Sequence, residues 1–192
     1  MEIPDDRRIR ELHERLAPSA DAFDLVYTHC RIVCRIAEQL LAGRPDAYDV
    51  ALVRAGCLLH DVGVYRLADG DHYLRHGVLG HDLLRELGFP ETLGRFCSHH
   101  TGVGITRDDV RRQGLPLPPA DYLAETAEER LVMYADKFHS KTAPPVFVSA
   151  ATYRTAVRRF GEEKVAVFAA MVRRYGEPGL EPLAAEFGHP IT

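Results

Sequence analysis

Apolar residues recur at helical spacing along most of this chain. The clearest stripe repeats every three or four positions, and its members are Phe23, Val26, Cys30, Val33, Ala37 and Leu40. This period predicts a long amphipathic helix. Ser19 is a suitable N-cap, and we expect the helix to run to about Leu41 with Gly43 as its C-terminal stop. A short charged helix over 5–17 precedes it and ends at Pro18.

The same reasoning predicts helices throughout the rest of the chain. A second helix should begin after Pro45, with Asp46 near its N-terminus, and continue to His60. Thr126 and Glu129 have the spacing of a capping box for a helix that reaches Phe138. The further helices are expected at about 73–87, 91–98, 107–113, 149–160 and 162–175. The fold class predicted from these patterns is all-α.

Composition indicates one domain that occupies residues 1–192. A chain of 192 residues with 46% hydrophobic residues can bury a sizeable core. The net charge of -4 does not favour binding to a nucleic-acid polymer, which is itself negatively charged. The polar start does not resemble a signal peptide, and no apolar run is long enough to span a membrane. With Cys30, Cys34, Cys57 and Cys97 interpreted as reduced core residues, we expect a cytoplasmic protein.

The candidate chemistry is concentrated at His60-Asp61, which follows the apolar Leu58-Leu59 and precedes Gly63. Neutral imidazole and carboxylate are common ligands of catalytic divalent metals. Adjacent ligands can both reach a metal only where a helix ends, and Gly63 supplies such an end. The alternative, a surface His-Asp pair before a turn, is difficult to reconcile with the two preceding leucines.

Other histidines and one aspartate can complete such a site. His29 lies at the edge of the buried stripe, and Asp136 lies on an apolar helix where an unpaired carboxylate would be costly. Taken alone, His29 would be a hydrogen-bonded core histidine and Asp136 would pair with Lys137 or Arg130. Together with His60 and Asp61 they favour a metal site in the core. The downstream candidates are His76, His99 and His100, whereas His81 is interpreted as a surface residue.

The order of these residues resembles the HD superfamily of metal-dependent phosphohydrolases, which are all-α helical bundles. His60-Asp61-Val62-Gly63 is close to the HDIG variant of the family signature. The resemblance covers about 20–142 and leaves 143–192 as C-terminal covering helices. The superfamily includes the HD-GYP cyclic-dinucleotide phosphodiesterases. Val64 occupies the position where those enzymes have lysine, and their Gly-Tyr-Pro motif is missing here, which argues against a cyclic-di-GMP substrate.

The resemblance implies a site for two divalent ions, of Fe, Mn or Mg. Asp61 would bridge the two ions and is the catalytic candidate, while His29, His60 and Asp136 would hold the first ion. His76 and one residue of the pair His99 and His100 would hold the second ion. His100 fits better because Thr101-Gly102 follows it, as in the small bacterial diadenosine-tetraphosphate hydrolases of the same superfamily. His99 would then be a hydrogen-bond donor near the site.

The expected reaction is hydrolysis of a nucleotide or another small phosphate ester by a hydroxide that bridges the metals. Candidate phosphate-binding residues are Lys137, Lys141, Arg75 and Arg107. Two alternatives stay open at this point: a mixed-valent diiron oxygenase of HD type, and a non-catalytic binding module that the metals stabilise. The sequence identifies neither the substrate nor the oligomeric state.

The segment 105–125 is the least regular part of the chain. It joins the His99-His100 corner to the helix of Asp136, and prolines at 116, 118 and 119 stiffen it. Two interpretations are open: a flap that closes over substrate, or a static connector that packs Leu115 and Leu117 onto the core.

Overall fold

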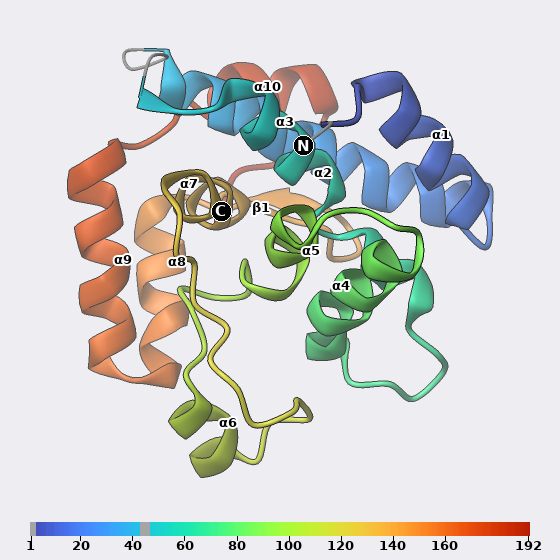
Figure 1. Cartoon of the computed structure of the whole chain (residues 1–192). Helices are drawn as coiled ribbons and strands as arrows, with labels where there is room; N and C mark the ends of the chain where they lie inside the picture. Colours follow the sequence, from blue (N-terminus) through green and yellow to red (C-terminus); the bar gives the residue numbers. More distant parts are fainter. Residues whose placement is uncertain (1–2, 43–46) are drawn as a thin grey trace.

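The computed structural model describes residues 3–42 and 47–192, and nearly all of its regular structure is helical (Figure 1). The expected all-α class is confirmed. The helices of the first two thirds of the chain are α1 (Asp6–Leu16), α2 (Ala20–Leu41), α3 (Val50–Leu59), α4 (His76–Glu86), α5 (Glu91–Ser98), α6 (Arg107–Gln113) and α7 (Ala127–Asp136). Two short 3-10 helices, η2 (Val62–Arg66) and η3 (Tyr73–Arg75), connect α3 to α4.

The core forms where α2 packs against α3 and α7, and where α4 packs against α5 and η2. Its largest fully buried side chains include Tyr134, Phe96, Phe138 and Ile32. All four cysteines are buried and none forms a disulfide, which agrees with their expected role as core residues. The helices that carry the candidate ligands are therefore fixed on several sides by apolar packing.

The C-terminal part contains α8 (Ala150–Val157), η4 (Arg158–Phe160), α9 (Glu162–Tyr175) and α10 (Glu181–Phe187). Figure 1 shows α8 and α9 side by side, and the two helices are in contact. The apolar periodicity predicted both helices, whereas α10 was not predicted. A two-stranded antiparallel sheet, in which β1 (His139–Ser140) pairs with β2 (Val146–Phe147), was not predicted either.

The end of the described chain pairs with this small sheet. Ile191 forms a parallel bridge with Phe147, and the backbone N–H of Ser149 donates to the carbonyl of Thr192 at 2.8 Å. The C-terminal segment thus does more than cover the helical core. It pairs with β2, whose partner strand β1 begins at His139, three residues after Asp136.

The helix termini test the predicted caps. The Ser19 hydroxyl accepts from the N–H of Ala22 and caps α2 as expected. Helix α3 begins at Val50, later than predicted, because Asp49 is its N-cap and accepts from Leu52. The predicted roles of Gly43, Pro45 and Asp46 lie outside the described residues.

The predicted capping box of α7 is only half formed. Thr126 accepts from the N–H of Glu129, but the Glu129 carboxylate accepts from the N–H of Glu125 and from Arg95 instead of from the N–H of Thr126. A complete capping box opens α6, where Thr106 and Asp109 exchange both hydrogen bonds. The buried ion pair with Arg95 is the competing interaction that draws Glu129 away.

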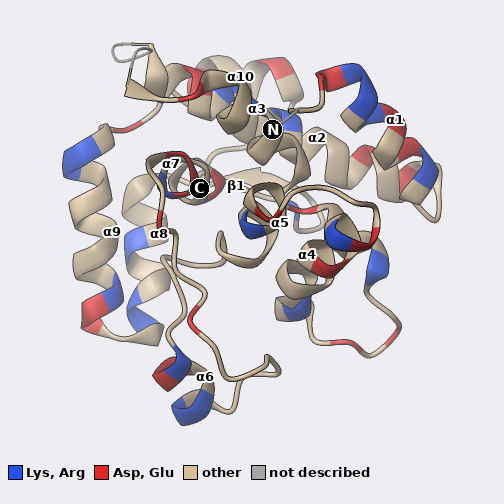
Figure 2. Ribbon diagram, viewed as in Figure 1, with Lys and Arg blue, Asp and Glu red and all other residues tan. Residues whose placement is uncertain are grey.

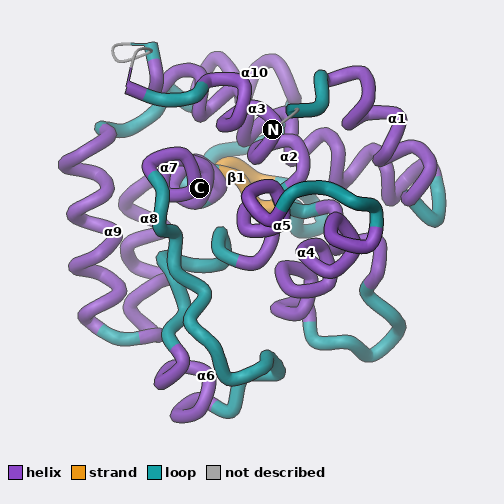
Figure 3. The backbone as a smooth tube through the Cα atoms, viewed as in Figure 1, coloured by secondary structure: helices purple, strands orange, loops and turns teal. Residues whose placement is uncertain are grey.

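The segment 105–125 forms a narrow excursion that carries α6 at its tip (Figure 3). Ile105 and Tyr122 close its base through two backbone hydrogen bonds of 3.1 and 2.7 Å. The Tyr122 hydroxyl donates to the carbonyl of Pro118, which ties the returning stretch to the proline-rich part.

Acidic and basic residues alternate over the outer helices and gather on no single side in the view of Figure 2. Among the described residues, no helix is both long enough and apolar enough to cross a bilayer.

Gly63 lets η2 and α4 approach each other closely, directly after His60-Asp61. A Cβ atom at Gly63 would lie 2.0 Å from the carbonyl oxygen of His76 and 2.3 Å from the amide nitrogen of Gly80. Both neighbours are backbone atoms of α4, so they cannot rotate away. The glycine therefore serves close packing between the two segments that bear Asp61 and His76.

We expect Gly63→Ala to lower the free energy of unfolding by about 3 kcal/mol, because overpacking against backbone forces α4 to move. Gly179→Ala is the matched control, since its Cβ would meet only the side-chain oxygen of Gln39 at 3.8 Å. Urea unfolding of both variants measures the difference. Equal stabilities would show that the contact between η2 and α4 is easily relaxed.

Candidate metal centre

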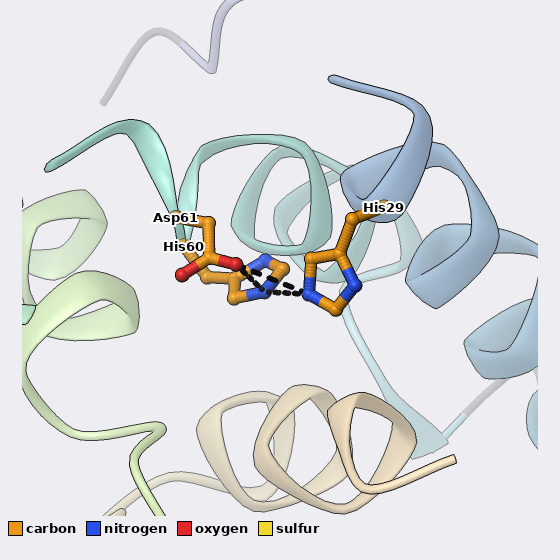
Figure 4. Close-up of side chains that lie close together, drawn as sticks. All are labelled: His29, His60 and Asp61. Atoms are coloured by element: carbon orange, nitrogen blue, oxygen red, sulfur yellow. Dashed lines mark hydrogen bonds and ion pairs between the residues drawn. The ribbon is translucent and has the colours of Figure 1, made fainter. Parts of the chain in front are cut away.

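The candidate ligands come from separate elements and converge on one buried place. His29 lies in the middle of α2, His60 and Asp61 follow the end of α3, and Asp136 is the last residue of α7. Figure 4 shows His29, His60 and Asp61 with their polar atoms directed toward one another. Three groups of three residues have ligand atoms within 4.8 Å of one another: His29 with His60 and Asp61; His60 with His100 and Asp136; and Asp61 with His76 and His100.

The Asp61 carboxylate divides these ligands into two sets. Its Oδ2 lies 3.1 Å from Nε2 of His29 and 3.4 Å from Nε2 of His60. Its Oδ1 lies on the other side, 3.2 Å from Nε2 of His76 and 3.7 Å from Nε2 of His100.

Asp136 belongs to the first of these sets. Its Oδ1 lies 3.0 Å from Nε2 of His29 and 3.4 Å from Nε2 of His60. The first set is thus His29, His60, Asp136 and one oxygen of Asp61. The second set is His76, His100 and the other oxygen of Asp61.

Backbone carbonyls determine which imidazole nitrogen faces the cluster. Nδ1 of His60 donates to the carbonyl of Cys57 at 2.7 Å, and Nδ1 of His76 donates to that of Tyr73 at 2.7 Å. Nδ1 of His100 lies 3.0 Å from the carbonyl of Phe96. With Nδ1 held by a carbonyl, each Nε2 faces the cluster and is the nitrogen that can coordinate a metal.

His29 is oriented differently, by a chain of two further histidines. Its Nδ1 lies 2.8 Å from Nδ1 of His139, and Nε2 of His139 lies 3.0 Å from Nδ1 of His189. Burial and then the neighbouring His29 and His189 lower the pKa of His139 to about 2, so this ring is neutral. A neutral His139 accepts from His29 with one nitrogen and donates to His189 with the other.

The electrostatics of the cluster favour ionised carboxylates. Burial acts to raise the pKa of Asp61, but Lys141 and His60 outweigh it and hold that pKa well below its usual value. Burial opposes ionisation of Asp136 in the same way, and Lys137 and His29 outweigh it, so the Asp136 pKa is also well below its usual value. Two negative charges, those of the buried Asp61 and the half-buried Asp136, thus lie within one cluster of histidines.

The same charges favour a cation between the ligands. Burial lowers the pKa of His60, but the charge of Asp61 reverses this and raises the His60 pKa well above its usual value. Burial and the nearby His60 keep the pKa of His100 well below its usual value, so His100 is neutral.

A divalent cation suits this set of donors. Asp61 Oδ1 is buried and has no hydrogen-bond partner among the described residues, although two imidazole nitrogens face it. An orphaned carboxylate oxygen of this kind is costly unless it coordinates a cation. Neutral imidazole nitrogens and carboxylate oxygens are suitable ligands for Mn, Fe and related metals. The residues therefore fit the divalent metal that the resemblance to the HD superfamily implies.

The cluster opens into a polar pocket of about 390 Å³. Its described lining residues are His29, Asp61, Tyr73, His76, His100, Thr101, Gly102, Asp136, Lys137, His139, Ser140, Lys141 and Thr142. Lys137 donates to Asp136 Oδ2 at 2.7 Å and to the carbonyl of His100 at 2.9 Å, and Lys141 is hydrogen-bonded to Asp61 Oδ2. Two of the four predicted phosphate-binding cations thus reach the cluster.

The other predicted site residues lie away from the pocket. Arg75 pairs with Asp71 of its own loop, and Arg107 is exposed at the start of α6. His99 points elsewhere, with Nδ1 at 2.6 Å from the Ser98 hydroxyl. That hydroxyl also bonds His81, so His81 is a half-buried link between α4 and α5 and not a surface residue.

Other residues near the ligands were not predicted. His139 and His189 orient His29, and Tyr73 and Thr142 line the pocket. The signal for His139 was its place three residues after Asp136, at the start of a strand too short to detect. His189 had no local signal, because it is 50 residues from the histidine that it contacts.

The comparisons with known proteins agree with this geometry. The family model for the HD domain matches residues 26–141, which is more than half of the chain. The chain therefore belongs to the HD domain family. Its resemblance to the HDIG subgroup stays a prediction.

Each of three curated relatives matches more than half of the chain. An uncharacterised protein of Methanocaldococcus jannaschii is 46% identical over 114 residues, which are 58% of this chain and 64% of that protein. Two proteins named tRNA (cytidine(56)-2'-O)-methyltransferase, from Picrophilus torridus and Thermoplasma volcanium, are 34% and 33% identical over 64% and 70% of this chain. The matches span only 33% and 36% of those two proteins.

The fold is also similar to that of a solved structure. The HD domain of the L. monocytogenes phosphodiesterase PgpH has a TM-score of 0.50 and 16% identity, with 85% of this chain and 94% of that domain covered. Its complex with cyclic-di-AMP has a TM-score of 0.50 and 15% identity, with 88% and 97% covered. At this identity the likeness shows the fold.

We expect His139→Phe to weaken metal binding by about 10- to 100-fold, because His29 loses the acceptor that fixes its ring. The phenyl ring retains most of the packing, so the melting temperature should change little. Competition with a chromophoric chelator measures the metal affinity. His81→Ala is the control, since His81 bonds Ser98 and Glu91 away from the ligands. Unchanged affinity in His139→Phe would remove His139 from the site.

Proposed function

We propose that this chain is a metal-dependent phosphohydrolase that acts on a nucleotide or another small phosphate ester with two divalent ions. The observation that carries the proposal is the division of Asp61, whose two oxygens face two different pairs of imidazole nitrogens. A carboxylate placed in this way is the natural bridge of a dinuclear site.

The ligand sets follow from the distances. His29, His60 and Asp136 would hold one ion with Asp61 Oδ2, and His76 and His100 would hold the other with Asp61 Oδ1. His99 is not included, because its ring nitrogen is bonded to Ser98. When bound, such ions lower the pKa of a water molecule toward neutrality and neutralise charge on phosphoryl oxygens.

The protein supplies positive charge for the phosphate group. Burial acts to lower the pKa of Lys137 and Lys141, but Asp136 and Asp61 outweigh it and raise both. Both ammonium groups are therefore charged at neutral pH. They line the same pocket as Asp61, His76 and His100. These lysines can orient a phosphoryl group and stabilise its negative charge.

The charges in the pocket favour this function over a diiron oxygenase. Both functions use histidine and aspartate ligands, but two buried ammonium groups suit an anionic phosphate group better than an uncharged C–H substrate. Aerobic absorption and EPR spectra of the iron-loaded protein test the oxygenase alternative. A non-catalytic module would bind metals and turn over nothing.

The comparisons do not identify the substrate. PgpH is a phosphodiesterase whose HD domain has been solved with cyclic-di-AMP, but the likeness to it concerns the fold. Methyl transfer to tRNA is named for whole proteins of which about two thirds lie outside the match. The phosphate-ester class is thus proposed from the site itself. A screen of phosphomonoesters and phosphodiesters would show which of the two the protein hydrolyses.

The direct test is a panel of phosphomonoesters, phosphodiesters and nucleotides, incubated with the protein and Mn, Fe or Mg, with phosphate or product detected by chromatography. We expect turnover that EDTA removes and metal restores. Metal binding without turnover of any phosphate ester would leave the non-catalytic module as the better description.

We expect His76→Ala and His100→Ala each to bind one metal ion per chain where the native protein binds two. The rate of hydrolysis should fall by about 100-fold or more, because two ions together would stabilise the negative charge on the attacking and leaving oxygens. Elemental analysis and calorimetric titration measure the stoichiometry, and circular dichroism checks the fold. Two ions per chain in both variants would contradict the second ligand set.

We expect Lys141→Met to raise KM for phosphate esters by about tenfold, with metal binding retained or tighter. The ammonium group of Lys141 bonds the same Asp61 oxygen that would coordinate an ion, so its removal frees a ligand. Arg107→Met is the control, because it removes an equally long cation outside the pocket. A loss of metal in Lys141→Met would mean that the lysine organises the ligands.

A further inference from the structure

A second cavity adjoins the metal pocket. It has a volume of about 100 Å³ and shares Thr101 and Gly102 with the metal pocket. Leu74 lines it, and the preceding Tyr73 lines the metal pocket. A Cβ atom on Gly102 would meet nothing within 4 Å, so the chain leaves open space where the two cavities meet.

The walls of this cavity are mostly apolar. The described apolar side chains that line it are Leu74, Val103, Ile105, Leu115, Val157 and Phe160. Phe160 is 43% exposed, so part of its ring remains accessible to a ligand. An apolar ligand group would find contact surface here and little to hydrogen-bond.

The two charged residues of the described lining neutralise each other. Lys164 donates to Asp109 Oδ2 at 2.6 Å and to the carbonyl of Gly104 at 2.8 Å. Burial acts to raise the pKa of Asp109, but Lys164 outweighs it and lowers that pKa. Because these two charges pair with each other, the described lining of this cavity carries no net charge. The cavity therefore suits an uncharged group.

This cavity depends on the C-terminal part of the chain. Val157, Phe160 and Lys164 come from α8, η4 and α9, outside the residues 26–141 that match the HD domain. The excursion 105–125 supplies a further part of the wall, through Ile105, Gln113 and Leu115. The described residues of that excursion line this cavity and not the metal pocket. If the excursion moves as a flap, it therefore closes over this cavity and not directly over the metal ligands.

We propose that this cavity is a subsite for the uncharged, apolar part of the substrate, of about single-ring size, whose phosphate group lies in the metal pocket. An apolar cavity of roughly 150 Å³ in another protein holds one benzene ring, so about 100 Å³ with an open mouth suits a similar group. The inference deepens the proposed function and rests on it, because it assigns the phosphate to the neighbouring pocket.

The experiment compares ligands that differ only in the apolar group. The metal-loaded protein is titrated calorimetrically with 2-phenylethylphosphonate and with ethylphosphonate, neither of which can be hydrolysed. We expect the phenyl compound to bind about tenfold more tightly, because its apolar ring moves out of water into the cavity. Equal affinities would overturn the subsite.

Two variants locate the preference. Phe160→Ala and Leu115→Asn should bring the affinity ratio close to one while ethylphosphonate binds as before. Leu25→Ala is the matched control, because Leu25 is also 43% exposed and lies on α2 outside the described lining. A ratio that stays near tenfold in both cavity variants would place the ring elsewhere and overturn the proposal.

A third ligand separates this inference from the proposed function. 2-Phenylethanol has no phosphonate, so its binding to the native protein and to Phe160→Ala, followed by NMR, tests the cavity alone. Saturable binding that Phe160→Ala removes supports the subsite even if no phosphate ester is hydrolysed. Absence of such binding, together with hydrolysis of simple phosphate esters, would overturn the subsite and leave the proposed function intact.

Discussion

The buried carboxylate of Asp61 is the interaction on which the arrangement of this protein depends. Bringing a charged carboxylate out of water costs several kcal/mol, and only close partners offset that cost. Here the partners reach it from α2, the end of α3, the start of α4 and the turn after α5. Because each oxygen faces different imidazoles, no single helix can shift without leaving one side of the charge uncompensated.

Most of the ligand orientation is local. His60, His76 and His100 each bond a carbonyl three or four residues earlier, so the turn that carries the ligand also fixes its ring. His29 differs, because its Nδ1 faces another side chain and not a backbone carbonyl. It is fixed instead by His139, which is 110 residues away. The first ligand set therefore depends on tertiary structure more than the second.

This difference explains how far the sequence could predict the structure. Helical periodicity and the His60-Asp61 pair after two leucines were enough for the fold class and the centre of the site. Strands of two residues carry no readable period, so β1 and β2 were missed. Charge type alone could not separate Lys141, which reaches Asp61, from Arg75, which Asp71 holds. Pairings across the chain, such as that of His189, leave no local pattern.

The tail that carries His189 lies beyond the residues 26–141 that define the HD domain match. Its position has a consequence for modularity. A homologue that retains the matched segment but replaces the tail must give His139 another partner, or leave that nitrogen to water. The ligands and the residues that support them thus extend beyond residues 26–141, the segment that matches the family model. Grafting that segment alone into another protein would transfer the ligands and His139, but not His189, which bonds the other nitrogen of His139.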